Sequence, residues 1–285
     1  MSAGPGHAKQ ARTAGQQGEA TPVRRKVAII TGAATGVGAA VARMLAGKGY
    51  DVLVNYSRSA DAAEGVVAEC RTLGADAFAA QGDVARDADC QALAQQAMAR
   101  WGRIDALVCS AGATRFIPMG DLAAVTTADF ERAYAVNSIG PFQMARAVQP
   151  HMQNGVQGGG AIVNVSSVAG LSGSGSSFPY VMSKAALNIL TVALARNLAP
   201  AIRVNAVLPG LVEGRWMREG LGDDAAYERV KGQFAATAAL GKVSKPEQIA
   251  SAVCWLLEED SVVTGQLIPV DAGFMLGKPP AAAGR

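Results

Sequence analysis

The stretch KVAIITGAATGVGAAVARMLAGK (residues 26–48) starts with an apolar run, passes through a glycine-rich turn and continues as an alanine-rich segment. A strand, a turn and a helix in this order form the first unit of many parallel α/β sheets. The turn has the spacing G-x3-G-x-G instead of the dinucleotide fingerprint G-x-G-x-x-G, so a tight turn with helix-packing glycines remains an alternative to a pyrophosphate site. In a pyrophosphate site, the N–H groups at the start of the helix would bind the anion. The turn supplies five candidate cofactor-binding residues: Gly32, Thr35, Gly36, Val37 and Gly38.

The same alternation continues along the rest of the chain. Several of the apolar runs are hydrophobic at consecutive positions, as expected for strands that are buried on both faces of a parallel sheet. We therefore predict an α/β fold, a single-domain, Rossmann-like, doubly wound sheet of about seven parallel strands with helices on both faces. The predicted strands are 26–31, 51–55, 76–81, 105–110, 161–167, 202–208 and 266–270. The predicted helices are 36–48, 60–73, 87–101, 127–153, 178–199 and 245–259.

The domain is expected to span residues 23–276. Residues 1–22 are rich in Gly, Ala and Gln and lack the apolar stretch of a signal peptide, which predicts a flexible N-terminal extension. Residues 277–285 are predicted to form a shorter C-terminal tail. The irregular, glycine-containing stretch 211–240 is typical of a mobile lid over a substrate.

Composition excludes several classes of function. A formal net charge of +3 with scattered basic residues argues against nucleic-acid binding. No apolar run reaches the roughly 18 residues of a membrane span. Four cysteines without C-x-x-C spacing, and only two histidines, favour free thiols in the cytoplasm and no metal, with a Cys70–Cys90 disulfide as the alternative.

The stretch VLVNYSRSAD (52–61) indicates which dinucleotide would bind. A site for NAD usually has an acidic residue here to bind the ribose 2′-hydroxyl, but this chain has Ser57 and Arg58. A guanidinium can bind a 2′-phosphate through paired charged hydrogen bonds, which favours NADP(H) over NAD(H). The alternative is that Arg58 is an ordinary solvated residue that opens the next helix.

Asp83 follows the third predicted strand in the stretch GDVA (82–85). Its carboxylate would accept a hydrogen bond from the adenine amino group, or it would cap the next helix; both interpretations remain open. Val84 is included with it as a candidate cofactor-binding residue.

The stretch NVSSVAGLSGSGSSFPYVMSKAA (164–186) contains the candidate chemistry. Tyr180 and Lys184 are four residues apart on a predicted helix and so share one face, and Ser167 ends the strand before it. A tyrosine titrates near 10, so a nearby cation such as Lys184 would lower its pKa and make it a usable acid or base. The Ser167 hydroxyl would hold the substrate oxygen beside the phenol. An unreactive Tyr–Lys pair on a helix surface is the alternative for that pair taken alone.

From Lys26 to Leu276 the chain resembles the short-chain dehydrogenase/reductase family, in the branch that contains the 3-oxoacyl-(acyl-carrier-protein) reductases. The resemblance rests on TGAATGVG, the DV at 83–84, AYAVNSIGPF, Ser167, Tyr180-x3-Lys184, NAVLPGLV and TGQLIPVDAG. It implies hydride transfer from a nicotinamide without a metal, and a homotetramer that associates through the helices 127–153 and 178–199. It also implies that Asn137 joins a water-linked proton relay through Lys184. Further cofactor contacts implied by the resemblance are Ser110, Ala111, Gly112, Pro209, Gly210 and Val212.

Three departures from the family pattern matter. Cys109 and Ser110 replace two asparagines at the end of the fourth strand, so the side-chain bonding that ties strands together is expected to be weaker. Gly214 stands where a threonine often contacts the cofactor. The stretches NGVQGGGA (154–161) and NLAPAI (197–202) contain no Lys or Arg, so an acidic acyl carrier protein is not the favoured partner.

The sequence thus predicts an NADP(H)-dependent oxidoreductase of the cytoplasm that acts on CH–OH groups, with Asn137, Ser167, Tyr180 and Lys184 as catalytic residues. The substrate is either a 3-oxoacyl group or a small ketone or secondary alcohol. Its pocket is expected to be lined by 116–119, 169–178 and the 211–240 segment. The alternative is a catalytically silent dinucleotide sensor or scaffold with the same fold.

Overall fold

Seven parallel strands form one sheet in the order β3-β2-β1-β4-β5-β6-β7. The computed structural model describes residues 1–2, 4, 25–155, 159–258 and 261–278. The strands are β1 Lys26–Thr31, β2 Tyr50–Tyr56, β3 Ala77–Gln81, β4 Ala106–Cys109, β5 Gly160–Val165, β6 Ile202–Pro209 and β7 Leu267–Val270. The predicted doubly wound α/β sheet is therefore confirmed, and the predicted strand ends differ from the observed ones by at most two residues.

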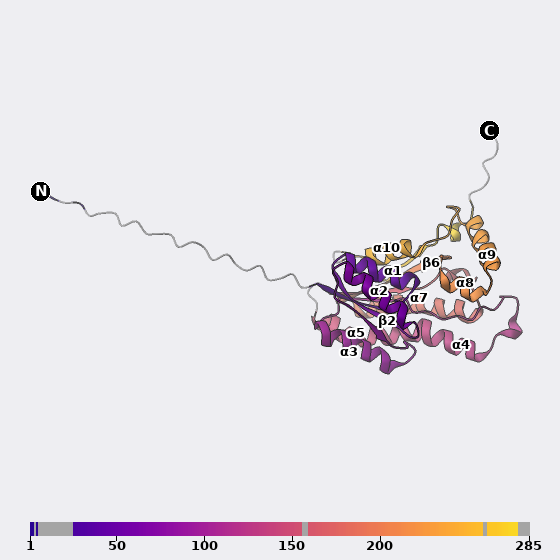
Figure 1. Cartoon of the computed structure of the whole chain (residues 1–285), viewed down its shortest axis with the longest axis horizontal. Helices are drawn as coiled ribbons and strands as arrows, with labels where there is room; N and C mark the ends of the chain where they lie inside the picture. The colour runs from indigo at the N-terminus through magenta and orange to yellow at the C-terminus, as the bar shows by residue number, and fades with distance from the viewer. Residues whose placement is uncertain (3, 5–24, 156–158, 259–260, 279–285) are drawn as a thin grey trace, which may run out of the picture.

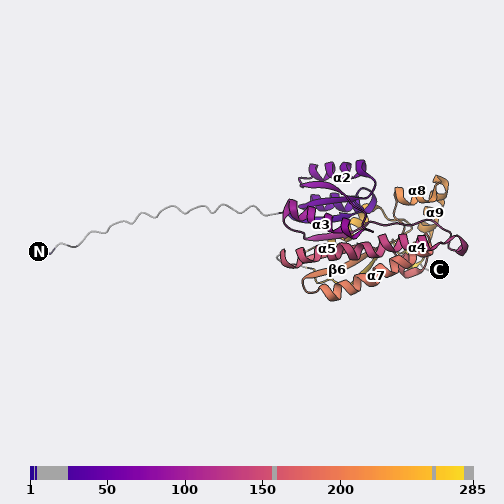
Figure 2. The same ribbon diagram turned by 90° about the horizontal axis from the view of Figure 1, so that it is seen from below.

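Helices cover both faces of this sheet (Figure 1). The helices α1, α2 and α10 lie on one face, and α3, α5 and α7 lie on the other, which Figure 2 shows from below. The helices are α1 Gly36–Gly47, α2 Ala60–Thr72, α3 Asp87–Trp101, α4 Thr127–Tyr134, α5 Gly140–Gly155, α6 Ala169–Ser172, α7 Phe178–Leu198, α8 Arg215–Leu221, α9 Asp224–Thr237 and α10 Pro246–Leu256.

The sheet separates the two largest clusters of the hydrophobic core. In β1, Ala28 and Ile30 belong to the cluster under α1, α2 and α10, whereas Val27 and Ile29 belong to the cluster under α3, α5 and α7. All four side chains are fully buried. Burial on both faces explains why the first strand is apolar at consecutive positions.

Two predicted elements are wrong in detail. The expected helix 127–153 is divided into α4 and α5 by a π-helical turn, η2 (Ala135–Ile139), and Asn137 lies at its centre. The stretch 211–240, expected to be irregular, contains the helices α8 and α9. Neither feature follows from residue pattern, because a π turn and short surface helices depend on what they pack against.

The remaining predictions about the chain concern its ends, its thiols and its longest helix. Residues 5–24 and 279–285, which make up most of the two predicted extensions, lie outside the described residues. All four cysteines are free, buried thiols, so the alternative Cys70–Cys90 disulfide is wrong. Among the described helices, α7 alone is long and apolar enough to cross a membrane, but it packs against β6, α4 and α6 as a core helix.

Candidate active site

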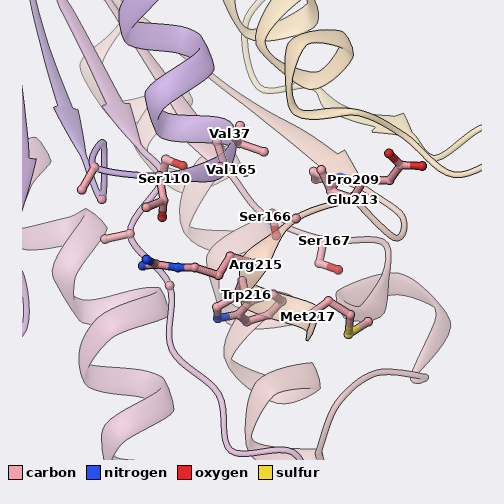
Figure 3. Close-up of a pocket in the computed structure, with 18 of the residues that line it drawn as sticks. Val37, Ser110, Val165, Ser166, Ser167, Pro209, Glu213, Arg215, Trp216 and Met217 are labelled. Carbon is pink, nitrogen blue, oxygen red and sulfur yellow. The ribbon is translucent and has the colours of Figure 1, made fainter. Parts of the chain in front are cut away.

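A cavity of about 330 Å³ opens at the carboxyl ends of the strands, where the strand order reverses between β1 and β4. Open α/β sheets bind their ligands at this position. Figure 3 shows Val37 and Ser110 on one side of the cavity, Ser166 and Ser167 near its centre, and Arg215 and Trp216 below them. Fifteen predicted site residues line it: Gly32, Thr35, Gly36, Val37, Ser57, Arg58, Ser110, Ala111, Gly112, Ser167, Tyr180, Lys184, Pro209, Gly210 and Val212. Four others lie outside its wall: Gly38, Asp83, Val84 and Asn137.

Two glycines of the first turn are required by close backbone approaches. A Cβ on Gly32 would lie 2.7 Å from the Cα of Ala111, and a Cβ on Gly38 would lie 2.5 Å from the carbonyl oxygen of Gly32. The turn therefore contacts the loop after β4 directly, and α1 begins against the turn. The side chain of Thr35, the N-cap residue of α1, makes no capping hydrogen bond, so the first N–H groups of α1 remain available beside the cavity.

Thr31, which the sequence analysis did not single out, links the ends of β1 and β4. Its Oγ1 accepts hydrogen bonds from the backbone N–H groups of Ser110 (3.1 Å) and Ala111 (3.2 Å). This contact takes over part of the strand-tying role that Cys109 and Ser110 were expected to weaken. A hydroxyl residue at the end of the first strand was the available signal.

Arg58 lies at the outer end of the cavity, before Ser59, the N-cap residue of α2. It is exposed and has no ion pair with any residue that the structure describes. A second cavity of about 280 Å³ adjoins it, also lined by Asp83, Arg86 and Arg132. Arg86 is paired with Asp89 and Arg132 with Asp83, so Arg58 is the guanidinium that stays available to an anion in these two cavities.

The structure rejects one of the two interpretations of Asp83. The N-cap residue of α3 is Arg86, so Asp83 does not cap that helix. Its Oδ1 accepts a hydrogen bond from the N–H of Ala85 (3.0 Å), and its Oδ2 accepts one from Arg132 (3.1 Å). Burial would raise the pKa of the Asp83 carboxyl, but these partners hold the pKa below its usual value. Val84 is buried and packs against Gly140, away from both cavities.

Tyr180 and Lys184 reach the cavity from the first turns of α7. The Ser177 hydroxyl accepts a hydrogen bond from the N–H of Tyr180 (3.4 Å) and so fixes the start of the helix. The Nζ of Lys184 lies 5.8 Å from the centre of the Tyr180 ring and donates a hydrogen bond to the Val165 carbonyl oxygen (2.9 Å). Ser167, two residues past the end of β5, completes the group.

Burial sets the protonation of this pair. Burial raises the pKa of Tyr180 to about 12, although its hydrogen bond with Ser167 acts in the opposite direction. Burial also lowers the pKa of Lys184 to about 8. The sequence analysis expected Lys184 to bring the pKa of Tyr180 below 10. That expectation is wrong for the protein by itself, because burial raises the pKa of Tyr180 by more than the Ser167 hydrogen bond lowers it.

Asn137 lies behind the cavity, in the π turn, and is fully buried. Its Nδ2 donates to the Ala113 carbonyl oxygen (2.9 Å) and to the Ser183 hydroxyl (2.9 Å), and its Oδ1 accepts from the Ala113 N–H (2.8 Å). Ser183 in turn donates to the carbonyl oxygen of Tyr180 (2.8 Å). Both amide hydrogens are therefore used to tie the loop after β4 to the turn of α7 that carries Tyr180.

The segment after β6 forms one wall of the cavity. Residues 211–217 line it, whereas the rest of 211–240 does not. Within 116–119 and 169–178, also expected as walls, no residue lines the cavity itself. Phe116 instead contacts the ring of Trp216, and Met119 packs against the cluster that contains Tyr180. Five wall residues belong to none of the wall segments or site residues predicted from the sequence: Ala34, Tyr56, Ser59, Val165 and Ser166.

The thiols take no part in this chemistry. Burial raises the pKa of Cys109, which lies at the end of β4, and raises the pKa of Cys70 to about 11 and of Cys90 and Cys254 to about 12. A thiol with a raised pKa is a poor nucleophile. Among the described residues, no three His, Cys, Asp or Glu side chains are grouped so that they could hold a metal ion.

Comparison with known proteins identifies relatives over most of the chain. A family profile described as enoyl-(acyl carrier protein) reductase matches residues 32–275. Ketoacyl reductase 2 of the granaticin polyketide synthase from Streptomyces violaceoruber is 39% identical over 88% of this chain and 96% of its own. The 3-oxoacyl-(acyl-carrier-protein) reductase of Staphylococcus aureus is 34% identical over 88% of this chain and 98% of its own.

Solved structures agree with these relatives. A structure from Burkholderia xenovorans, described as a short-chain dehydrogenase/reductase, matches with a TM-score of 0.82 and 41% identity, covering 90% of this chain and all of that one. A 7α-hydroxysteroid dehydrogenase, solved with NADH and 7-oxo glycochenodeoxycholic acid, matches with a TM-score of 0.76 and 32% identity, covering 87% and 93%.

Proposed function

Since this chain belongs to the short-chain dehydrogenase/reductase family and is an oxidoreductase of carbonyl and CH–OH groups, we propose that it uses NADP(H) and that Tyr180 is its general acid and base. The observation that carries the proposal is the convergence of Ser167, Tyr180 and Lys184 in one cavity at the reversal of strand order. The substrate is either a 3-oxoacyl group or a small ketone or secondary alcohol.

The residues present fit a dinucleotide. Because Gly32 has no side chain, the backbone of the first turn lies directly against the loop after β4. The start of α1, which has no side-chain cap, adjoins the cavity. Thr35, Gly36 and Val37 would hold the pyrophosphate there, and Pro209, Gly210 and Val212 would hold the nicotinamide carboxamide. When bound, the cofactor would supply or accept the hydride.

The preference for NADP(H) rests on Arg58. It lies with Ser57 at the end of β2, where an NAD site usually has a carboxylate. Among the described residues it has no ion-pair partner, whereas the two arginines beside it are paired. A free guanidinium next to a ribose 2′-phosphate forms charged, paired hydrogen bonds. We also keep Asp83 as the proposed partner of the adenine amino group. Its carboxylate lines the second cavity, and the hydrogen bond from Arg132 helps to keep it ionised.

Three side chains would move the proton during reduction of a carbonyl. The Ser167 Oγ accepts a hydrogen bond from the Ala169 N–H (3.1 Å) and its hydroxyl is hydrogen-bonded to Tyr180, so a substrate oxygen held between the two hydroxyls would take over the hydrogen of Ser167. The Tyr180 Oη is neutral at pH 7 and delivers its proton to that oxygen as negative charge develops on it. The ammonium of Lys184, with a pKa of about 8, can then return a proton to the phenolate near neutral pH.

Asn137 contributes by position. Its amide holds Ser183, and through Ser183 the backbone of Tyr180, so we propose that it keeps the phenol aligned with Ser167. Because both hydrogens of the Asn137 side-chain amide are used, a proton relay through Asn137 would have to use an atom other than Nδ2.

The segment 211–240 is proposed as the substrate lid, since its first residues form the wall nearest Tyr180. A homotetramer is also proposed, supported by apolar side chains on one face of the molecule, in η2, α5 and α7. These side chains are 37–70% exposed: Ile139, Phe142, Met182, Ile189 and Val192. The four free thiols favour the cytoplasm, and a carrier-protein partner is disfavoured by the absence of Lys and Arg from 154–161 and 197–202.

The test is a panel of ketones and 3-oxoacyl thioesters with NADPH and NADH, followed by loss of cofactor absorbance. Replacing Tyr180 by Phe should lower kcat by about 10²–10⁴-fold, the usual contribution of general acid catalysis, without changing NADPH binding. Full turnover by Tyr180→Phe would exclude the mechanism. Tight NADPH binding without turnover of any substrate would favour the silent sensor or scaffold instead.

A further inference from the structure

The indole of Trp216, on α8, stands beside the proposed catalytic phenol. Its ring centre lies 5.8 Å from that of Tyr180, with the two planes inclined by 47°. Trp216 lines the cavity but remains 48% exposed, so much of its ring is in contact with no other residue. Figure 3 shows the indole with Met217 below Ser167. A large apolar surface thus lies next to the position where a substrate carbonyl would be held.

A second aromatic ring holds the indole in this place. Phe116 meets Trp216 edge-on, with ring centres 5.8 Å apart and an interplanar angle of 61°. The Phe116 ring also packs directly against Gly220, one turn further along α8, where any side chain would overlap it. Because Phe116 and Tyr180 both contact it, Trp216 is positioned by two rings from different parts of the chain.

Charge near the indole does not point to an anionic substrate. Arg215, its neighbour in the cavity wall, is ion-paired with Glu219 (3.0 Å), and Glu213 is ion-paired with Lys231 (3.0 Å). On this wall, the accessible side chain beside Tyr180 is therefore the aromatic ring of Trp216. Aromatic rings favour offset or edge-to-face contact with another ring over contact with a saturated chain of equal area.

Resting on the proposed function, we propose that Trp216 is a specificity-determining residue that selects cyclic ketones with a fused aromatic ring over saturated or linear ketones. The carbonyl of such a substrate would be held by Ser167 and Tyr180, and its ring would pack on the free face of the indole. This narrows the two substrate classes above to the small-ketone class.

Three ketones with the same number of carbon atoms test this proposal: 2-tetralone, 2-decalone and 2-decanone. The first two have the same fused ten-carbon skeleton with the carbonyl at the same position, and they differ in whether the ring without the carbonyl is aromatic. The wild-type protein should reduce 2-tetralone with a kcat/KM about 3- to 10-fold above that of 2-decalone, as expected from the usual strength of an aromatic pair. The value for 2-decanone should be the lowest of the three.

Substitution of the indole should remove this preference. In Trp216→Leu the ratio of kcat/KM for 2-tetralone to that for 2-decalone should fall to about 1, and Trp216→Phe should keep part of it. The matched control is Trp255→Leu, because Trp255 lies on α10, outside the cavity, and is 47% exposed. Calorimetric binding of the same ketones to the protein with NADP⁺ provides a readout independent of turnover.

The outcomes separate this proposal from the one on which it rests. An unchanged ratio in Trp216→Leu, or reduction of 2-decanone as efficient as that of 2-tetralone, would overturn the role of Trp216 and leave the reductase function standing. Failure of the wild-type protein to reduce any carbonyl in the wider panel would count against the reductase function. Ketone binding in calorimetry, with the same dependence on Trp216, would then still support the aromatic site.

Discussion

Replacing Lys184 by methionine is expected to stabilise the folded protein while removing its activity. The Lys184 side chain is 4% exposed, and burial depresses its pKa from 10.5 to about 8. Because one pKa unit corresponds to about 1.4 kcal/mol, the charged lysine destabilises the fold by about 3 kcal/mol at pH 7. Methionine has a similar length and no charge, and its main loss is the hydrogen bond to Val165, worth about 1 kcal/mol.

The net gain at pH 7 is therefore about 2 kcal/mol, which corresponds to a rise in Tm of roughly 4–8 °C for a domain of this size. The pH dependence of this gain in stability follows from the lowered pKa of Lys184. Between pH 8 and 10.5 the unfolded chain binds more protons at Lys184 than the folded chain does, so wild-type stability increases with pH in this window. The difference between the two proteins should thus shrink to about 1 kcal/mol at pH 9.

Thermal or urea unfolding of both proteins at pH 7 and pH 9 measures this difference. Lys242→Met is the control, since Lys242 is exposed and its loss should change stability by less than about 0.5 kcal/mol. The reasoning is refuted if Lys184→Met is less stable than the wild type at pH 7, or if the difference is the same at both pH values. Tyr180 and the cysteines are present in both proteins, so their titration largely cancels in the comparison.

Three further substitutions test separate parts of the site. Arg58→Ala should reduce the preference for NADPH over NADH by about 10-fold or more, the value of a charged hydrogen bond, and titration with both cofactors measures it; equal affinities in the parent protein would contradict it. Gly38→Ala places a methyl group 2.5 Å from the Gly32 carbonyl oxygen, so we expect a loss of about 1–3 kcal/mol in urea unfolding together with weaker NADPH binding, and an unchanged midpoint would argue otherwise. Gly220→Ala places a methyl group where the Phe116 ring lies, and it should raise the KM for carbonyls several-fold without changing NADPH affinity. If NADPH affinity fell as well, the effect of the substitution would not be confined to the lid.

The parts of the site that the sequence predicts are those set by local geometry. Tyr180 and Lys184 share a helix face because their spacing is four, whatever the helix packs against. The glycines of the first turn can be predicted because the turn joins a strand to a helix and neighbouring backbone must approach it closely. The alternation of strands and helices was sufficient to predict the parallel sheet, since buried parallel strands are apolar at consecutive positions.

The parts that the sequence did not predict depend on contacts between distant segments. Thr31 matters because parallel pairing brings it to the loop after β4, and its hydroxyl at the end of the first strand does not by itself identify that partner. The π turn at Asn137 exists where its amide meets Ala113 and Ser183, 24 and 46 residues away. Trp216 acquires a role only because Phe116, about a hundred residues earlier, packs beside it. The wrong expectation for the pKa of Tyr180 has the same origin, because burial is a property of the whole fold.

The two pKa shifts together bear on the direction of the reaction. Reduction of a carbonyl requires a protonated Tyr180, and with a pKa of about 12 the phenol of the free protein is protonated throughout the neutral range. Oxidation of an alcohol requires the phenolate, which burial disfavours, and Lys184, the cation over the Tyr180 ring, loses its own charge above pH 8. An oxidised nicotinamide ring would have to supply the missing positive charge in that direction, whereas reduction needs no such help. The same burial that costs the fold stability at Lys184 therefore holds the proton on Tyr180 for reduction.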